Sequence, residues 1–153
     1  MDQDLLIAEL RADEGEKLTA YLDSLGLWTV GVGHLIDPKR GADPAPFGVD
    51  LRGGGIITSA QSAMLLEVDI KHKSEELDEK LPWWRNLTDN RQRVIMNMAF
   101  QMGVDGLMKF RHALMAMQNG DFNEAKRQML DSDWAKHQTP QRAWRLADRM
   151  VAG

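Results

Sequence analysis

The chain has 153 residues, of which 43% are hydrophobic and 27% charged, and it contains no cysteine. This is the composition of a globular domain, and it excludes disulfide-rich scaffolds and thiolate metal sites. The formal charge of −4 is uneven: residues 1–83 carry 8 basic against 16 acidic residues, and residues 84–153 carry 11 against 7. The basic half is either an ordinary solvated surface or one suited to an anionic surface such as a bacterial envelope.

The first segment predicts a short amphipathic helix. Residues 2–13 space Leu5, Leu6, Ala8 and Leu10 at helical intervals. This acidic segment lacks the basic start and apolar core of a signal peptide, so we expect the protein to accumulate in the cytoplasm. No apolar run approaches the roughly 20 residues of a membrane span, so no stable membrane insertion is expected.

The character of the chain changes after this helix. Residues 17–36 are rich in β-forming residues and are punctuated by Gly26, Gly31 and Gly33, which predicts a small antiparallel hairpin or meander. Residues 37–55 hold three prolines and five glycines, a density that predicts a long loop without regular structure.

Helical patterns dominate from Thr58 onward. Thr58 and Gln61 form a capping box, and the spacing that follows predicts a helix to about residue 80. Such a helix spans about 33 Å, enough to join two lobes. Further helices are predicted over residues 91–102 and 109–118.

The end of the chain carries three more boundary signals. Asn119-Gly120 predicts a helix end, and Asp121 with Glu124 predicts a second capping box. Thr139 followed by a proline predicts the start of the last helix, with the threonine as the N-cap.

Two carboxyl groups near the start of the chain are candidates for acid and base chemistry. Glu14 lies at the predicted end of the first helix, where the terminal carbonyls disfavour an ionised carboxylate, as suits a general acid. Asp23 follows in the hairpin region, where we expect it to stay ionised as the partner of the acid. Thr29 offers a hydroxyl to orient a water. Taken alone, this pair is more simply interpreted as surface carboxylates.

The motif as a whole is more specific than the pair. Asp13-Glu14-Gly15, Tyr21-Leu22-Asp23 and the run from Thr29 to His34 closely resemble the catalytic segment of the phage-type lysozymes. Two later segments also resemble that family, in the same order: NMAFQMG at 97–103 and QTPQRA at 138–143. The resemblance implies that Glu14 is the general acid, that Asp23 is its partner and that Thr29 supports the water.

The resemblance also implies supporting residues. His34 matches a histidine that the family pairs with an aspartate on the linking helix, here Asp69, which favours a structural ion pair over a proton carrier. Leu35 is a candidate substrate contact.

The later segments supply further candidates with alternatives. Phe100 is either a substrate contact or a core residue. Gln101 costs stability in an apolar helix unless its amide is bonded, which favours a position near the acid. Arg142 either contacts the substrate or clamps the carboxylates near Glu14, and Arg145 is a rival partner for Asp13.

Some features depart from the family pattern. The loop over residues 37–55 is richer in proline and glycine, and Ala113 and Gln128 stand where the family has serine and asparagine. One extra residue precedes Gln138, so Lys136 and His137 are not assignable. The methionines are interpreted as core filling, and the tryptophans of the second half as core or surface packing rather than sugar stacking.

Together these observations predict an α+β, lysozyme-like fold. We expect a small β-containing lobe over residues 14–57, a linking helix over residues 58–80 and a helical lobe over residues 81–153, to which residues 1–13 return.

The expected function is hydrolysis of the β-1,4 bond between N-acetylmuramic acid and N-acetylglucosamine in peptidoglycan, by an inverting mechanism, during phage lysis of a host. The four histidines are scattered, so no metal or cofactor is expected. We expect a monomer that binds glycan strands and no nucleic acid. We expect it to reach its substrate through a holin-type pore. Two alternatives are a lytic transglycosylase, against which Asp23 and Thr29 argue, and a non-catalytic glycan-binding or inhibitory module, against which both carboxylates argue.

Overall fold

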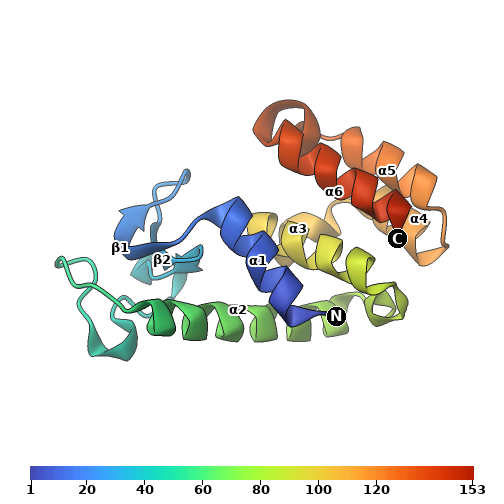
Figure 1. Cartoon of the computed structure of the whole chain (residues 1–153). Coiled ribbons are helices and arrows are strands. Elements are labelled where there is room, and N and C mark those ends of the chain that lie inside the picture. The colour runs from blue at the N-terminus through green and yellow to red at the C-terminus, as the bar shows by residue number, and fades with distance from the viewer. The chain divides into compact units, whose positions relative to one another are not determined.

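The computed structural model describes all 153 residues, which divide into two compact units. One unit combines residues 1–6 with residues 73–153, and the other comprises residues 7–72. Two helices contribute residues to both units: α1 (Gln3–Glu14) and α2 (Ser59–Lys80), which Figure 1 labels. Helices and one small sheet make an α+β fold, as predicted, while the expected lobe boundaries stay a prediction.

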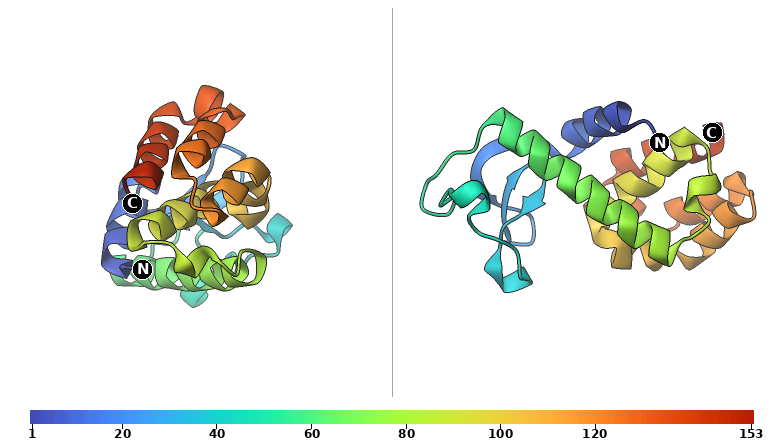
Figure 2. Two further views of the ribbon diagram at one scale, coloured as in Figure 1. Left: turned by 90° about the vertical axis from the view of Figure 1, so that its right-hand side faces the viewer. Right: turned by 90° about the horizontal axis from the view of Figure 1, so that it is seen from below.

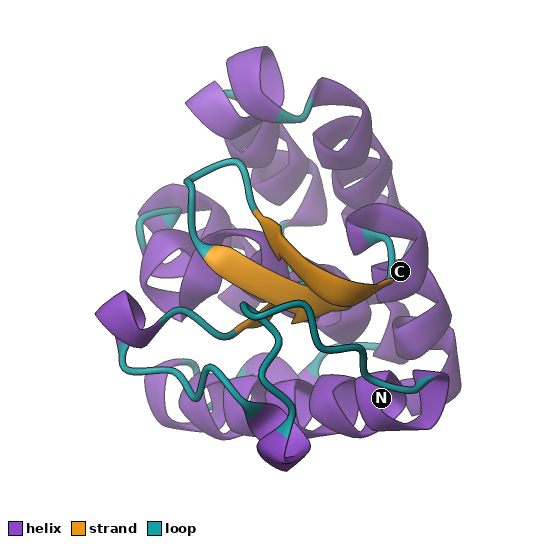
Figure 3. Cartoon of the chain, turned by 90° about the vertical axis from the view of Figure 1, so that its left-hand side faces the viewer, coloured by secondary structure: helices purple, strands orange, loops and turns teal.

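The unit of residues 7–72 contains an antiparallel sheet of three strands, which Figure 3 shows in orange. The strands are β1 (Lys17–Leu22), β2 (Trp28–Gly31) and β3 (His34–Leu35), and they pair in the order in which they occur. The predicted meander is therefore confirmed. The register between β1 and β2 is irregular between its first and second pairs, because β1 carries extra residues there.

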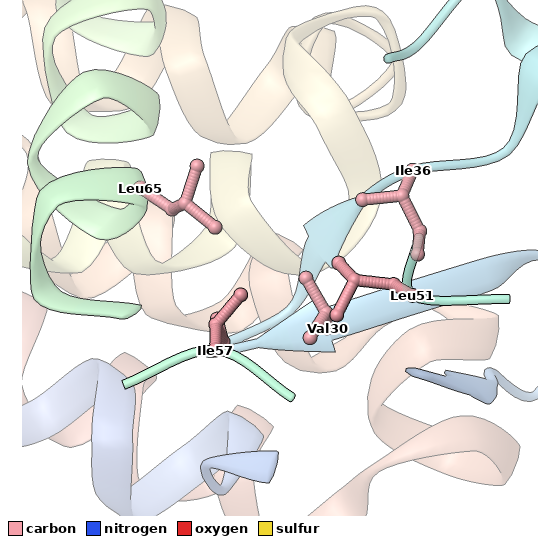
Figure 4. Close-up of a cluster of buried hydrophobic side chains, with 5 residues drawn as sticks. All are labelled: Val30, Ile36, Leu51, Ile57 and Leu65. Atoms are coloured by element: carbon pink, nitrogen blue, oxygen red, sulfur yellow. The ribbon is translucent and has the colours of Figure 1, made fainter. Parts of the chain in front are cut away.

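The sheet is anchored by a small hydrophobic core within the same unit. Figure 4 shows this core as side chains from β2, the following loop and α2, namely Val30, Ile36, Leu51, Ile57 and Leu65. All five are buried, and Leu18 and Trp28 pack against them from the strands. Fully burying one such side chain stabilises a fold by about 1.5–3 kcal/mol, so this cluster holds the loop against the sheet.

The loop after β3 is more regular than its composition predicts. The expectation of no regular structure over residues 37–55 is wrong in two places, where 3₁₀ turns occur: η1 (Pro38–Arg40) and η2 (Pro46–Gly48). Each begins at a proline, whose ring fixes φ at a value that suits the first helical position. Asp37 caps η1 by accepting the Lys39 N–H at 2.9 Å and also accepts the Trp28 N–H at 3.1 Å. These two bonds lower the pKa of the buried Asp37 and tie the loop to β2.

The predicted start of α2 is confirmed in detail. The Gln61 N–H donates to the Thr58 hydroxyl at 3.0 Å, and the Thr58 N–H donates to the Gln61 side chain at 2.9 Å. At the other end, Asp78 accepts from the Trp84 indole and, through both oxygens, from the Arg85 guanidinium. These bonds lower the pKa of Asp78 and hold the short turn η3 (Trp84–Asn86) against the end of α2.

The other unit is built from helices. After α3 (Asp89–Met108) come α4 (Arg111–Gln118), α5 (Phe122–Leu130) and α6 (Pro140–Ala152), and Figure 2 shows the last three, in orange to red, lying against one another. α3 is longer than the predicted helix over residues 91–102, and Gly103, at φ +76°, interrupts it. No helix combines the length and apolarity needed to cross a membrane.

The core of this unit supports the interpretation of the methionines as filling. Several methionines are almost fully buried, namely Met96, Met98, Met117, Met129 and Met150. Trp84 and Trp134 are buried as well, whereas Trp144 is 52% exposed. A flexible thioether fills irregular gaps between helices, which suits a bundle of short, differently oriented segments.

Two predicted caps differ in the structure. Asp121 accepts the Glu124 N–H, but its own N–H donates to the carbonyl of Ala116, so only half of the second capping box forms. Thr139 precedes α6 as predicted, yet its hydroxyl makes no cap and instead accepts a hydrogen bond from Gln101.

A wider helical turn lies where the sequence predicts one extra residue before Gln138. Residues Trp134–Gln138 form the π-helical turn η4, in which the Thr139 N–H donates to the Trp134 carbonyl at 2.9 Å. A π-turn holds one more residue than the corresponding α-turn, so it accommodates the insertion without displacing the start of α6.

Gly31 provides a test of how closely β2 approaches α2. Gly31 has φ +64°, and an added Cβ would lie 2.9 Å from the hydroxyl oxygen of the fully buried Ser62. We expect Gly31→Ala to lower the free energy of unfolding by about 2–4 kcal/mol, because backbone strain and a close contact act together.

Gly26→Ala is the matched control for this test. Gly26 has φ +74°, but an added Cβ there meets no atom within 4 Å, so only backbone strain of about 1–2 kcal/mol applies. Urea denaturation of both variants measures the difference. Equal losses in the two variants would contradict a close packing of Gly31 against Ser62.

Candidate functional site

Glu14 is the last residue of α1 and lies beside the turn between β2 and β3. An added Cβ at Gly33, which has φ +66°, would lie 3.7 Å from the Cγ and Oε2 atoms of Glu14. The turn therefore lies in van der Waals range of the Glu14 side chain, and its left-handed backbone at position 33 is one that glycine tolerates. Glu14 is half-buried, at the junction of a helix end and the sheet.

Asp23 lies in the turn between β1 and β2 and is held by it. One oxygen, Oδ1, accepts the N–H groups of Leu25 at 2.8 Å and Leu27 at 2.9 Å. The backbone N–H and carbonyl of Asp23 pair with Leu27 and Gly26 in the same turn. The carboxylate plane is therefore fixed by local bonds, and Oδ2 is the oxygen left for a further partner.

Thr29 lies opposite Tyr21 in the sheet and is 4% exposed. Its hydroxyl donates to the Leu27 carbonyl at 3.0 Å. Because its hydrogen is used in this bond, the Oγ1 atom can accept a hydrogen bond from a water through its lone pairs.

Tyr21 is the residue of this region that the sequence analysis did not assign. Burial raises the pKa of its phenol, and the negative charges of Glu14 and then Asp23 raise it further. Both candidate carboxylates therefore act on one phenol. In the sequence, Tyr21 stands two residues before Asp23, and along an extended chain this spacing directs two side chains to the same face. This spacing was the one signal in the sequence that Tyr21 belongs to the site.

The expected pairing of His34 with Asp69 is present. His34 Nδ1 lies 2.8 Å from Asp69 Oδ2, which joins β3 to α2 within the unit of residues 7–72. Leu35, the next residue of β3, lies opposite Thr29 and is half-buried. The supporting role of the pair stays a prediction.

The remaining candidates belong to the helical unit. Gln101 donates to the Thr139 hydroxyl at 2.9 Å and accepts from the Trp134 indole at 2.9 Å, so its amide is bonded as its place in an apolar helix requires. Arg142 donates to the side chain of Asn97 at 2.9 Å and to its carbonyl at 3.3 Å. Phe100 is half-buried in α3.

A pocket of about 420 Å³ opens in the helical unit. Its lining includes the apolar side chains of Met102, Phe110 and Trp134 together with Ala113 and Gln128, the two positions that depart from the family pattern. No group of three acidic or histidine side chains in the chain is arranged to hold a metal ion.

Comparison with known proteins gives matches along most of the chain. A family model described as phage lysozyme matches residues 11–149. A relative in Dictyostelium discoideum, probable T4-type lysozyme 1, is 35% identical over 94% of this chain and 92% of its own length. The pre-baseplate central spike protein Gp5 of Enterobacteria phage T4 is also 35% identical over 94% of this chain, which spans 27% of that protein. The endolysin of Salmonella phage P22 is 30% identical over 63% of this chain and 60% of its own length.

Proposed function

This chain belongs to the phage lysozyme family and is a glycoside hydrolase, and we propose that it cleaves the β-1,4 bond between N-acetylmuramic acid and N-acetylglucosamine in peptidoglycan. The observation that carries the proposal is the placement of two carboxyl groups from different elements of one unit: Glu14 at the end of α1, beside the turn between β2 and β3, and Asp23 held in the turn between β1 and β2. A pair of carboxyl groups beside one bond is the minimum equipment of most glycoside hydrolases.

We assign the two carboxyl groups different roles. Glu14, at the end of α1, is the general acid that protonates the glycosidic oxygen as the bond breaks. Asp23 Oδ2 is the base that takes a proton from the attacking water, while Oδ1 stays bonded to the turn. The second hydrogen of that water is donated to Thr29 Oγ1, whose own hydrogen is bonded to Leu27.

The other candidate residues are proposed to support this chemistry. The His34–Asp69 pair braces β3, which carries the proposed glycan contact Leu35. In the helical unit, Phe100 and Gln101 are proposed to contact the glycan, since a bonded amide presents a fixed polar surface. Arg142 is proposed to act as a structural support, and its bonds to Asn97 favour this role.

We also propose that the protein lyses the host of a phage, a role supported by its similarity to a phage protein named endolysin. In this role the enzyme acts as a monomer, accumulates in the host cytoplasm and reaches the cell wall through a holin-type pore. The substrate then meets the enzyme only after the membrane has been opened.

The acid role is tested by Glu14→Gln. An amide cannot donate a proton as a carboxylic acid does, so we expect the turbidity-clearing rate on bacterial cell walls to fall by about 10²–10⁴-fold. The matched control is Glu16→Gln, the same chemical change two residues along at an exposed site that pairs with Arg11. The control should keep the wild-type rate, and both variants should keep the wild-type melting temperature. Retention of more than a tenth of the activity by Glu14→Gln would remove Glu14 from the acid role.

The stereochemical outcome is tested on a defined oligosaccharide. We expect inversion, because a water held by Asp23 and Thr29 requires carboxyl groups about 6.5–9.5 Å apart, whereas direct attack by a carboxylate requires about 5–5.5 Å. Proton NMR of the first product should show the α-anomer. An initial β-anomer would mean retention and would exclude the water-mediated role of Asp23, and 1,6-anhydro ends would indicate a transglycosylase.

The release step is tested by expression in a Gram-negative host. Cells that make the enzyme alone should lyse slowly, and addition of a membrane-permeabilising agent should clear the culture within minutes. A Glu14→Gln culture treated in the same way is the control for lysis by the agent. Efficient appearance of uncleaved enzyme in the medium without a pore would contradict the proposal.

A further inference from the structure

The paired residues of the sheet form a row beside the candidate carboxylates. Tyr21 on β1 lies opposite Thr29 on β2, and Thr29 lies opposite Leu35 on β3. Directly paired residues in an antiparallel sheet present their side chains to the same face. Tyr21 and Leu35 therefore flank Thr29, the proposed partner of the attacking water, from its two sides.

Tyr21 reaches further from this row than Thr29 does. Thr29 is 4% exposed, whereas Tyr21 is half-buried, so the phenol forms the accessible part of the row on the β1 side. Its surroundings include both carboxylates, and burial and their charges, rather than a hydrogen bond to either, raise the pKa of the phenol. The hydroxyl thus stays protonated at neutral pH and acts as a permanent donor.

Lys17 holds the ring of Tyr21 from one face. Its Nζ atom lies 4.5 Å from the ring centroid, within the range of a cation–π contact. The irregular register between the Lys17–Gly31 pair and the Tyr21–Thr29 pair belongs to the same part of β1. A cation on one ring face restricts the rotation of the side chain.

We propose that Tyr21 is a substrate-contacting residue, whose hydroxyl donates a hydrogen bond to an oxygen of the saccharide bound between Glu14 and Asp23. Lys17 is a positioning residue that acts through the ring of Tyr21. This inference rests on the proposed function, because it names a contact to the same substrate. A donor that carries no charge binds a sugar oxygen without competing with Glu14 for the role of acid.

The placement of the phenol is tested without any measurement of activity. Tyr21 is the one tyrosine of the chain, so protein labelled with ¹³C at tyrosine Cζ gives a single NMR signal that reports its titration. Glu14→Gln and Asp23→Asn should each lower the pKa of the phenol, because each removes a negative charge, and Glu16→Gln is the control. Asparagine keeps an oxygen that can close the turn. An unchanged titration in both variants would overturn the placement.

The contact itself is tested by binding. Soluble, uncrosslinked peptidoglycan strands added to labelled Glu14→Gln protein at neutral pH should shift the Cζ signal in a saturable way, because this variant binds without turnover. Isothermal titration calorimetry compares this protein with a Glu14→Gln protein that also carries Tyr21→Phe and has no tyrosine signal; the second should bind the same strands about 5- to 20-fold more weakly, as expected for one lost hydrogen bond. Equal binding by the two proteins would overturn the contact.

The kinetic test separates this inference from the proposed function. Tyr21→Phe should raise KM about 5- to 20-fold and leave kcat and the melting temperature unchanged, because the contact exists before and during bond cleavage. Lys17→Met should raise KM about two- to fivefold in the wild-type background and have no effect in the Tyr21→Phe background. If Tyr21→Phe keeps the wild-type kcat and KM while Glu14→Gln is inactive, the role of Tyr21 is overturned and the proposed function stands. A wild-type protein that leaves cell walls intact would overturn the proposed function and this inference with it.

Discussion

The bonds that Asp23 makes within its own turn are the constraint on which the geometry of the candidate site depends. Its Oδ1 atom accepts two N–H groups, so the turn that joins β1 to β2 cannot form as it does without this side chain or a close substitute. The same turn sets the pairing of Tyr21 with Thr29. The Asp23 carboxylate therefore closes the turn between β1 and β2 and fixes the direction of its own Oδ2 atom. Through the same turn it sets Tyr21 opposite Thr29 in the sheet.

The glycines of β2 and the following turn extend this constraint to the helices. Gly31 allows the strand to approach the buried Ser62 of α2, and Gly33 supplies the left-handed backbone of the next turn, which lies in van der Waals range of Glu14 at the end of α1. The acid thus lies in van der Waals range of the turn between β2 and β3. Because the His34–Asp69 contact joins the same stretch to α2, three independent contacts fix the sheet relative to the helices that carry or brace the acid.

The elements that could be predicted are those that depend on local chemistry. The capping box of Thr58 and Gln61 formed as the sequence indicates, since both partners lie within one turn and nothing else competes for them. The cap expected of Thr139 did not form, and its hydroxyl instead accepts from Gln101, which is distant in sequence. The loop after β3 gained two 3₁₀ turns because each proline is followed by residues that close a turn, which composition alone does not reveal.

In the candidate site, too, local features could be predicted from the sequence and long-range contacts could not. The resemblance assigned roles to Glu14, Asp23 and Thr29 and contained Tyr21 without a role for it, since the influence of both carboxylates on Tyr21 arises only when the strands pair. Gln101 was expected to have a bonded amide, and the structure shows Trp134 and Thr139 as its partners, which its spacing did not identify. Its expected position near the acid stays a prediction. Long-range partners of polar side chains cannot be read from spacing, because many residues of the right type compete for them.

The candidate residues are divided between the two units according to their proposed roles in catalysis and in glycan binding. The proposed acid, base and water-holding hydroxyl all come from residues 7–72, where local turns and strand pairing fix them. The helical unit contributes bonded or half-buried side chains such as Gln101 and Phe100, which suit contact with a long substrate rather than proton transfer. Ala113 and Gln128 line a pocket of the helical unit, so substitutions there leave untouched the local turns and strand pairing that fix the groups proposed to break the bond.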